Sequence, residues 1–358
     1  MKLFICSDIM PGGVLPYQDA FIDTNLLEHM GTYDLRVGTL ECAIGTDLPY
    51  HQTKMDGSMN IVYAQDEDFP RVLTMGLDVV SLANNHVFDL GSEGLENTMK
   101  TLSRNNILYC GAGRNLQEAS KPAVINRGGK QIAFLAACMH GNKYLGHIEL
   151  AGENSPGVNP LDIEKICLDI QDAKKRYDYV FVLPHWGREH CHYPMMECIS
   201  MAKKMIRSGA DGVFGSHAHV PQPTICYKGK YICFGLGNFL FPDFLLQPPR
   251  PIWYPENREE IQLVEVRLGY PDSVEKPTKA TWGNAERIGQ YLMVELGNQI
   301  GLKKNFVEMS RDNVLGYYWD SQRISTKLYF LGLMCKFPIL RKLYCYLLKI
   351  RGANVDLY

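Results

Sequence analysis

Short β-rich runs that stop at polar residues are the feature of this sequence that most restricts its fold. They alternate with segments of helical period, and this alternation predicts a layered α/β domain. The runs cover residues 2–7, 34–40, 78–83, 131–137, 179–184, 211–216 and 231–237. Apolar residues at helical spacing predict helices at 92–106, 161–177 and 196–209. Because strand ends collect reactive groups in such folds, the residues that follow the runs are candidates for a site.

Most of these runs lead to side chains that can bind a metal or accept a proton. In chain order the candidate ligands are Asp8, Glu41, Asn85, His185, His217 and His219. Taken singly, each has an ordinary structural explanation, such as a turn or a helix cap. Together they combine carboxylates, which bridge hard cations, with neutral imidazoles and an amide, which leave positive charge to polarise a phosphate. The set predicts a site for one or two divalent metals, namely Mn²⁺, Fe or Zn²⁺.

Hydrolysis also needs an acid close to the metal, and the sequence offers one. His86 directly follows Asn85 and is the candidate proton donor to the leaving oxygen. Asp89 is placed to orient His86, and the competing explanation is that it ends a turn before the helix that begins near Ser92. The sequence contains no Ser-His-Asp elbow, P-loop or complete dinucleotide-binding fingerprint.

The order of these motifs resembles the bacterial capsule-synthesis proteins of CapA type, within the calcineurin-like metallophosphoesterase superfamily. The resemblance covers about residues 1–242 and rests on SDIMPGG, TLECAI, LANNHVFDLG, PHWGREH, GADGVFGSHAHVPQP and GLGNFLF. It implies a calcineurin-like α/β sandwich of two stacked sheets flanked by helices. It also implies metal-dependent hydrolysis of a phosphorylated or polymer-related substrate, linked to a poly-γ-glutamate capsule.

The resemblance further implies roles for single residues. The six candidate ligands match the family's metal-binding positions, and Glu189 matches the glutamate that closes the His-Trp-Gly motif. Asn238 is expected to steady a neighbouring ligand. Arg188 is a candidate contact for an anionic substrate group. Met10 stands where phosphoesterases at large have histidine, so one metal position lacks a usual ligand.

Two other functions fit the same residues. One is a non-catalytic metal-binding component of a polymer synthesis or export complex, which Met10 favours. The other is an amide hydrolase or transferase that acts on poly-γ-glutamate. Nucleic acid is not an expected partner, because the net charge is −2 and no arginine-rich arm is present.

The cysteines and the N-terminus bear on location. The 11 cysteines form no CxxC pair, which is typical of a reducing compartment. The first residues lack the long apolar stretch of a secretory signal. We therefore expect a cytoplasmic protein, with peripheral contact at the inner face of the membrane as a further expectation.

The last third of the chain differs in character. Residues 242–260 predict an irregular loop, and 260–269 and 290–297 predict strands that complete the second sheet. We expect a domain over residues 1–300 and a C-terminal extension over 301–358. The stretch at 327–352 mixes apolar and basic residues, and its apolar stripe favours a helix pair that closes the core and breaks at Pro338. The alternative is contact of this tail with a membrane surface or a synthesis complex.

Overall fold

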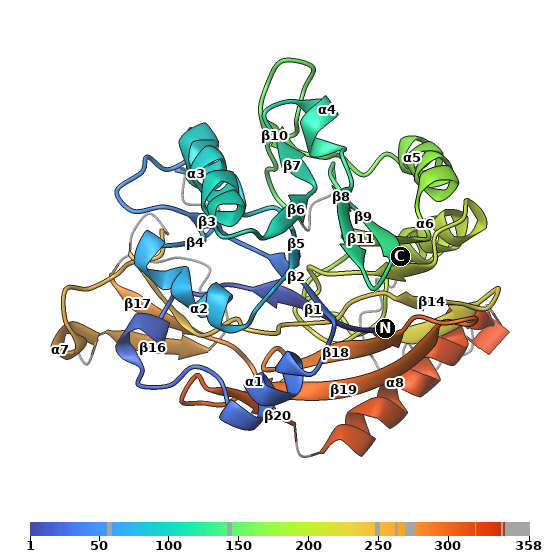
Figure 1. Cartoon of the computed structure of the whole chain (residues 1–358). Coiled ribbons are helices and arrows are strands. Elements are labelled where there is room, and N and C mark those ends of the chain that lie inside the picture. The colour runs from blue at the N-terminus through green and yellow to red at the C-terminus, as the bar shows by residue number, and fades with distance from the viewer. Residues whose placement is uncertain are drawn as a thin grey trace.

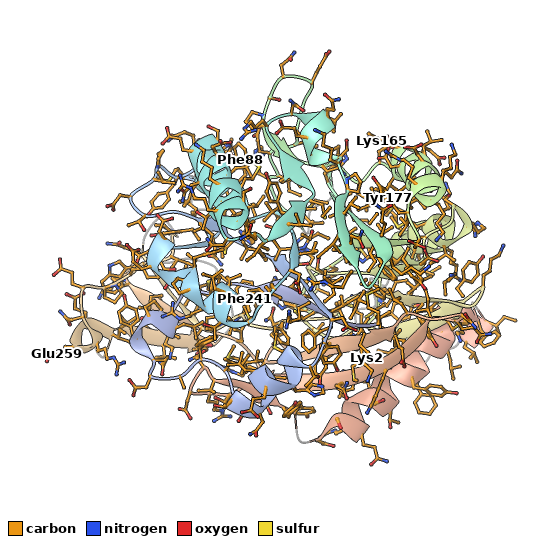
Figure 2. The ribbon with its side chains drawn as sticks, viewed as in Figure 1. Lys2, Phe88, Lys165, Tyr177, Phe241 and Glu259 are labelled. Carbon is orange, nitrogen blue, oxygen red and sulfur yellow. The ribbon has the colours of Figure 1, made fainter. Side chains whose placement is uncertain are left out.

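Two large β-sheets surrounded by helices build the fold (Figure 1). The computed structural model describes residues 1–55, 59–141, 145–247, 251–261, 264–268, 276–318, 320–337 and 339–340. One hydrophobic cluster takes side chains from both sheets, and Phe241 is among its fully buried members (Figure 2). The predicted α/β sandwich is confirmed.

The first sheet has seven strands in the order β20-β19-β18-β1-β2-β5-β6. Its parallel strands are β1 (Lys2–Ile9), β2 (Leu35–Leu40), β5 (Val79–Ser81) and β6 (Leu108–Cys110). Its antiparallel strands are β18 (Ile288–Glu295), β19 (Gly301–Met309) and β20 (Leu315–Tyr317). β1, β2 and β5 are almost entirely buried on both faces, which explains their continuous apolar runs, whereas β6 at the edge leaves Leu108 exposed.

The second sheet has six strands in the order β13-β14-β12-β11-β9-β8. Its parallel strands are β9 (Lys130–Cys138), β11 (Tyr179–His185), β12 (Gly212–Phe214) and β14 (Lys230–Cys233). The antiparallel strands β8 (Ala123–Arg127) and β13 (Thr224–Tyr227) lie at its two edges. Each large sheet therefore contains four parallel strands whose carboxyl ends can carry a site.

The three predicted helices are present, with ends that differ by a few residues. They are α3 (Gly91–Arg104), α5 (Ile163–Arg176) and α6 (Met196–Arg207). α5 begins at an N-cap, Asp162, whose side chain accepts hydrogen bonds from the backbone of Glu164 and Lys165. It then buries Ile166 and Ile170 against the second sheet. Helical spacing therefore located these elements because one face of each is apolar.

Several shorter elements were not predicted. The helices are α1 (Thr24–Gly31), α2 (Pro70–Thr74), α4 (Leu116–Ala119), α7 (Arg258–Ile261), and the 3-10 turns η1 (Leu15–Tyr17), η2 (Gln52–Lys54) and η3 (Asp66–Asp68). The strands are β3 (Ala43–Ile44), β4 (Tyr63–Ala64), β7 (Ala112–Gly113) and β10 (Gly157–Val158), which form two small ribbons. They are too short for a periodic signal in the sequence.

Two predictions for the last third were wrong. The segment 242–260 contains a strand, β15 (Phe244–Leu246), which pairs with β17 (Thr278–Thr281). The predicted strands at 260–269 and 290–297 do not complete the second sheet. The first contains β16 (Glu265–Leu268), which pairs with β17, and the second overlaps β18 in the first sheet. Alternation indicates a strand but does not identify its partner, which long-range packing decides.

The C-terminal part begins within the first sheet. The expected boundary at residue 300 falls between β18 and β19, which pair along their whole length, and the division into two units stays a prediction. α8 (Ser321–Lys336) buries Leu328 and Leu331 and leaves Tyr329 exposed. Among the described helices, none is long and apolar enough to cross a membrane. Residues 338 and 341–358 of the predicted tail lie outside the described part of the chain.

Candidate metal centre

The candidate ligands from the two sheets meet at the carboxyl ends of the parallel strands. Those of the first sheet are Asp8 in β1, Glu41 after β2 and Asn85 after β5, where the candidate acid His86 follows directly. Those of the second sheet are His185 at the end of β11 and His217 and His219 after β12. All are buried, and His86 is the most exposed of them at 7%. The chain thus brings together residues that lie up to two hundred positions apart.

Glu41 lies at the middle of this group. Its Oε1 is 3.3 Å from His185 Nε2 and 3.7 Å from His219 Nε2. Two sets of ligand atoms, each within 4.8 Å of one another, are Asp8, Glu41 and His185 on one side and Glu41, His217 and His219 on the other. Because Glu41 belongs to both sets, it lies where a carboxylate shared by two cations would lie.

Three carboxylate oxygens at the centre have no hydrogen-bond donor within the described part of the chain. They are Asp8 Oδ2 and both oxygens of Glu41. Burial raises the pKa of Asp8 to about 6, and burial followed by the negative charge of Asp8 raises the pKa of Glu41 well above its usual value. A buried carboxylate without a partner costs several kcal/mol. These oxygens therefore fit a bound cation, which would supply the missing partner.

The imidazoles are held in a state suited to metal binding. Burial, and then the proximity of His217, lowers the pKa of both His185 and His219 well below the usual value, so both rings are neutral. His185 Nδ1 lies 2.8 Å from Ser216 Oγ, and His219 Nδ1 lies 2.8 Å from Asn238 Oδ1. These contacts leave the two Nε2 atoms on the side of Glu41.

The turn GSHAH is built to present its histidines. His217 and His219 have positive φ angles, 85° and 54°, which non-glycine residues adopt at a cost and mostly at functional sites. Gly215 precedes them, and a Cβ there would lie 2.0 Å from the Phe234 carbonyl oxygen. The close approach of the two segments thus requires glycine and places the turn at the end of β12.

His86 belongs to a chain of buried charges. Its Nδ1 lies 2.8 Å from Asp89 Oδ2, which also accepts from the backbone N–H of Val62. The other oxygen of Asp89 pairs with Lys54, whose ammonium also donates to the backbone carbonyl of Asn85 at 2.7 Å. Burial lowers the pKa of His86. Burial alone would raise the pKa of Asp89, but the charges of Lys54 and His86 outweigh it and lower that pKa.

Lys54 was not predicted from the sequence. It lies in η2, which follows no apolar run, and it is only 3% exposed. A lone lysine in a polar segment is normally solvated, so no local pattern could have identified it.

Trp282 was missed for a similar reason. Its ring lies 5.0 Å from that of His219, and it follows a strand of the small third sheet.

The remaining predicted residues lie around the ligands. Asn238 donates to the backbone carbonyl of Glu286 at 3.0 Å and so anchors His219 to a second segment. Glu189 Oε1 is 3.9 Å from His219 Nε2, and burial raises the pKa of Glu189 to about 7. Arg188 is exposed, and Met10 is buried with its sulfur 3.3 Å from the Gly12 amide.

Comparison with known proteins finds relatives named for capsule biosynthesis. The "PGA biosynthesis protein CapA" of Bacillus subtilis is 36% identical over 168 residues, which are 47% of this chain and 43% of that protein. The "Capsule biosynthesis protein CapA" of Bacillus anthracis is 29% identical over 253 residues, 67% of this chain and 60% of that protein. The chain thus spans about half the length of these curated relatives.

Among solved structures, the calcineurin-like phosphoesterase YfkN of Bacillus subtilis aligns with a TM-score of 0.46 at 12% identity, over 95% of this chain and 98% of that one. A family model described as "Bacterial capsule synthesis protein PGA_cap" matches residues 2–243. That match covers about two thirds of the chain and includes every candidate ligand. The chain therefore belongs to the PGA_cap family of bacterial capsule synthesis proteins.

Proposed function

We propose that this protein is a metal-dependent hydrolase that cleaves a phosphoester during the synthesis of a poly-γ-glutamate type of capsule polymer. The observation that carries the proposal is the group of buried carboxylate oxygens on Asp8 and Glu41 that find no donor among the residues that the structure describes. Neutral nitrogen ligands surround them. Support for the polymer comes from the names of the two Bacillus relatives, which refer to PGA and capsule biosynthesis.

The ligand set determines what the centre can do. We assign the cation to Asp8, Glu41, Asn85, His185, His217 and His219. A divalent ion bound there supplies Lewis-acid polarisation of a phosphoryl oxygen and lowers the pKa of water. Mixed oxygen and nitrogen ligands suit Mn²⁺, Fe or Zn²⁺. The protein's own part is to exclude bulk water and to hold the ligands in fixed positions.

His86 is the proton donor in this proposal. Asp89 holds its Nδ1, so Nε2 is the nitrogen left to exchange a proton with the leaving oxygen. Lys54 fixes Asp89 in turn and acts as a positioning residue. Arg188 is exposed and is the proposed contact for a further anionic group of the substrate. A phosphorylated sugar or a lipid-linked intermediate would combine phosphate chemistry with polymer synthesis.

A non-catalytic role in a synthesis complex is the second candidate. The observation in its favour is Met10, a buried thioether at a position where phosphoesterases at large have histidine. A thioether is a poor ligand for hard divalent cations, so one of two metal positions is weakened. The third candidate, hydrolysis or transfer at an amide of poly-γ-glutamate, uses the same centre on a carbonyl group.

The phosphoesterase proposal predicts turnover of p-nitrophenyl phosphate or bis(p-nitrophenyl) phosphate in the presence of Mn²⁺. His86→Ala should lower kcat by about 10²–10⁴-fold with metal content unchanged, because only proton transfer is removed. His217→Ala should lose both activity and metal. His29→Ala, on α1 beside Tyr33, is the matched control and should behave like the wild type.

Three outcomes separate the candidates. Equal turnover in the wild type and His86→Ala would contradict the role of His86. Absence of turnover from a metal-loaded wild type favours the non-catalytic component. Release of glutamate from poly-γ-glutamate, without release of nitrophenol, favours the amide reaction.

The proposed contact of the tail with an anionic membrane has its own test. Residues 341–358 contain four basic residues, Arg341, Lys342, Lys349 and Arg351, each worth about 1 kcal/mol near an anionic surface. Deleting 341–358 should weaken sedimentation with phosphatidylserine vesicles by at least about tenfold. A deletion from residue 327 would also remove buried Leu328 and Leu331 of α8 and is less suitable. Equal sedimentation of both proteins would exclude a membrane role for this segment.

A further inference from the structure

A second group of metal-binding side chains lies apart from the centre described above. It consists of His51, His147 and Glu149, and its ligand atoms lie within 4.8 Å of one another. It shares no residue with the first centre. His51 immediately precedes η2, whereas His147 and Glu149 come from the segment between β9 and β10. Two segments almost a hundred residues apart thus bring two imidazoles and a carboxylate together.

The two distances from Glu149 to the imidazoles match those of a tetrahedral cation site. Glu149 Oε2 is 3.5 Å from His51 Nε2 and 3.4 Å from His147 Nε2. Zinc bonds of about 2.0–2.2 Å at tetrahedral angles separate neighbouring ligand atoms by about 3.4 Å. The two imidazole rings are nearly parallel, at 17°, with centroids 5.6 Å apart. One carboxylate oxygen of Glu149 therefore lies as far from two imidazole nitrogens as ligand atoms of the same metal ion lie from one another.

The state of His51 also suits a ligand. Burial lowers its pKa, so the ring is neutral at pH 7. Its Nδ1 lies 2.6 Å from Thr53 Oγ1, and when Nδ1 carries the proton the Nε2 lone pair points to Glu149. The side chains of His147 and Glu149 are 43% and 37% exposed. Solvent thus reaches the group from one side.

We propose that His51, His147 and Glu149 form a second metal site that binds a Zn²⁺-like transition-metal ion and leaves one coordination position open to water or an anionic group. Two imidazoles and one glutamate are a ligand set that zinc accepts with an open fourth position. The ion would join the segment at 147–149 to η2. Since the His51 backbone N–H donates to the Asp89 carbonyl at 2.8 Å and the His51 ring contacts Phe88, the site also supports the turn that carries His86.

The test measures bound zinc in protein whose first centre is disabled. The background is Asp8→Asn with Glu41→Gln, stripped with chelator and titrated with ZnCl₂ by calorimetry, with metal content determined after desalting. We expect one tightly bound equivalent. His147→Ala and Glu149→Gln in this background should each remove it, whereas His29→Ala should retain it.

The readout does not depend on turnover, so its failure is distinct from failure of the proposed hydrolase. If the background variant does not fold, the same comparison is made in the wild type, where His147→Ala should bind one zinc fewer than His29→Ala. The same zinc content in the His147→Ala and His29→Ala proteins would overturn the proposal. A zinc content that Glu149→Gln leaves unchanged would also overturn it.

Discussion

Replacing Glu41 with glutamine is expected to abolish divalent metal binding at the centre and to make the metal-free protein more stable. Both oxygens of Glu41 are buried and have no donor in the described ranges of the chain, and the carboxyl group lies beside that of Asp8. Glutamine removes one of two crowded acids and adds an N–H donor for Asp8. Burying an ion costs several kcal/mol of desolvation, so a neutral amide at this position should stabilise the metal-free fold. The gain in stability and the loss of metal should appear in the same variant.

Thermal unfolding with and without metal measures both effects. In chelator, the Glu41→Gln protein should unfold at a higher temperature than the wild type. Added Mn²⁺ or Zn²⁺ should raise the wild-type midpoint through preferential binding to the folded state and should raise that of the variant much less. Glu153→Gln, at an exposed position, is the matched control. A less stable variant in chelator, or equal stabilisation by metal, would show that Glu41 has another role.

The candidate ligands could be read from the sequence because each lies in or after a parallel strand, near its carboxyl end, and their binding of metal stays a prediction. Burial on both faces makes such strands continuous apolar runs, and the polar residue at the end of a run is visible without knowledge of the fold. Asp8, Glu41, Asn85 and His185 are of this kind. The pairing of the two sheets then fixes which runs end at the same place. Five independent strand ends, the last of them followed by both His217 and His219, were therefore enough to predict that the candidate residues would converge.

Other parts of the molecule have no local signal. Lys54 lies in a short 3-10 turn, and only the tertiary fold brings its ammonium to Asp89. The strand β18 was visible, but its place between β1 and β19 depends on contacts across the whole chain. The same is true of β16, which pairs with β17 in a small third sheet. Local patterns thus predicted which segments form helices or strands, whereas the pairing of the strands and the buried ion pairs depended on long-range packing.

Some candidate ligands and the residues that orient them could be predicted from the sequence, and others could not. His219 is visible in a motif, and Asn238, which fixes its ring, is visible in another. His51 and His147 lie in polar loop segments where a histidine is usually a solvated residue. The second metal site is therefore a proposal from the structure alone. Its prediction from sequence would need the knowledge that two loops meet.

Replacing Lys54 with methionine is expected to destabilise the fold by about 3–5 kcal/mol, the cost of leaving one member of a buried ion pair without its partner. Asp89 is fully buried, and Lys54 neutralises it while also donating to the Asn85 carbonyl. Lys100→Met is the control, because Lys100 pairs with Glu96 at the surface and such pairs contribute about 0–1 kcal/mol. Urea unfolding of the metal-free proteins measures both changes.

A double-mutant cycle separates the ion pair from the packing of the lysine stem. Lys54→Met combined with Asp89→Asn should cost clearly less than the sum of the two single changes, because the second substitution removes the charge that the first leaves unpaired. The coupling should be about 1–3 kcal/mol. Phosphoesterase turnover should nonetheless stay low in the double variant, since an amide holds the His86 imidazolium less well than a carboxylate does. If Lys54→Met costs no more than Lys100→Met, the buried pair does not stabilise the fold. If turnover recovers together with stability, Lys54 and Asp89 support the structure but do not position His86.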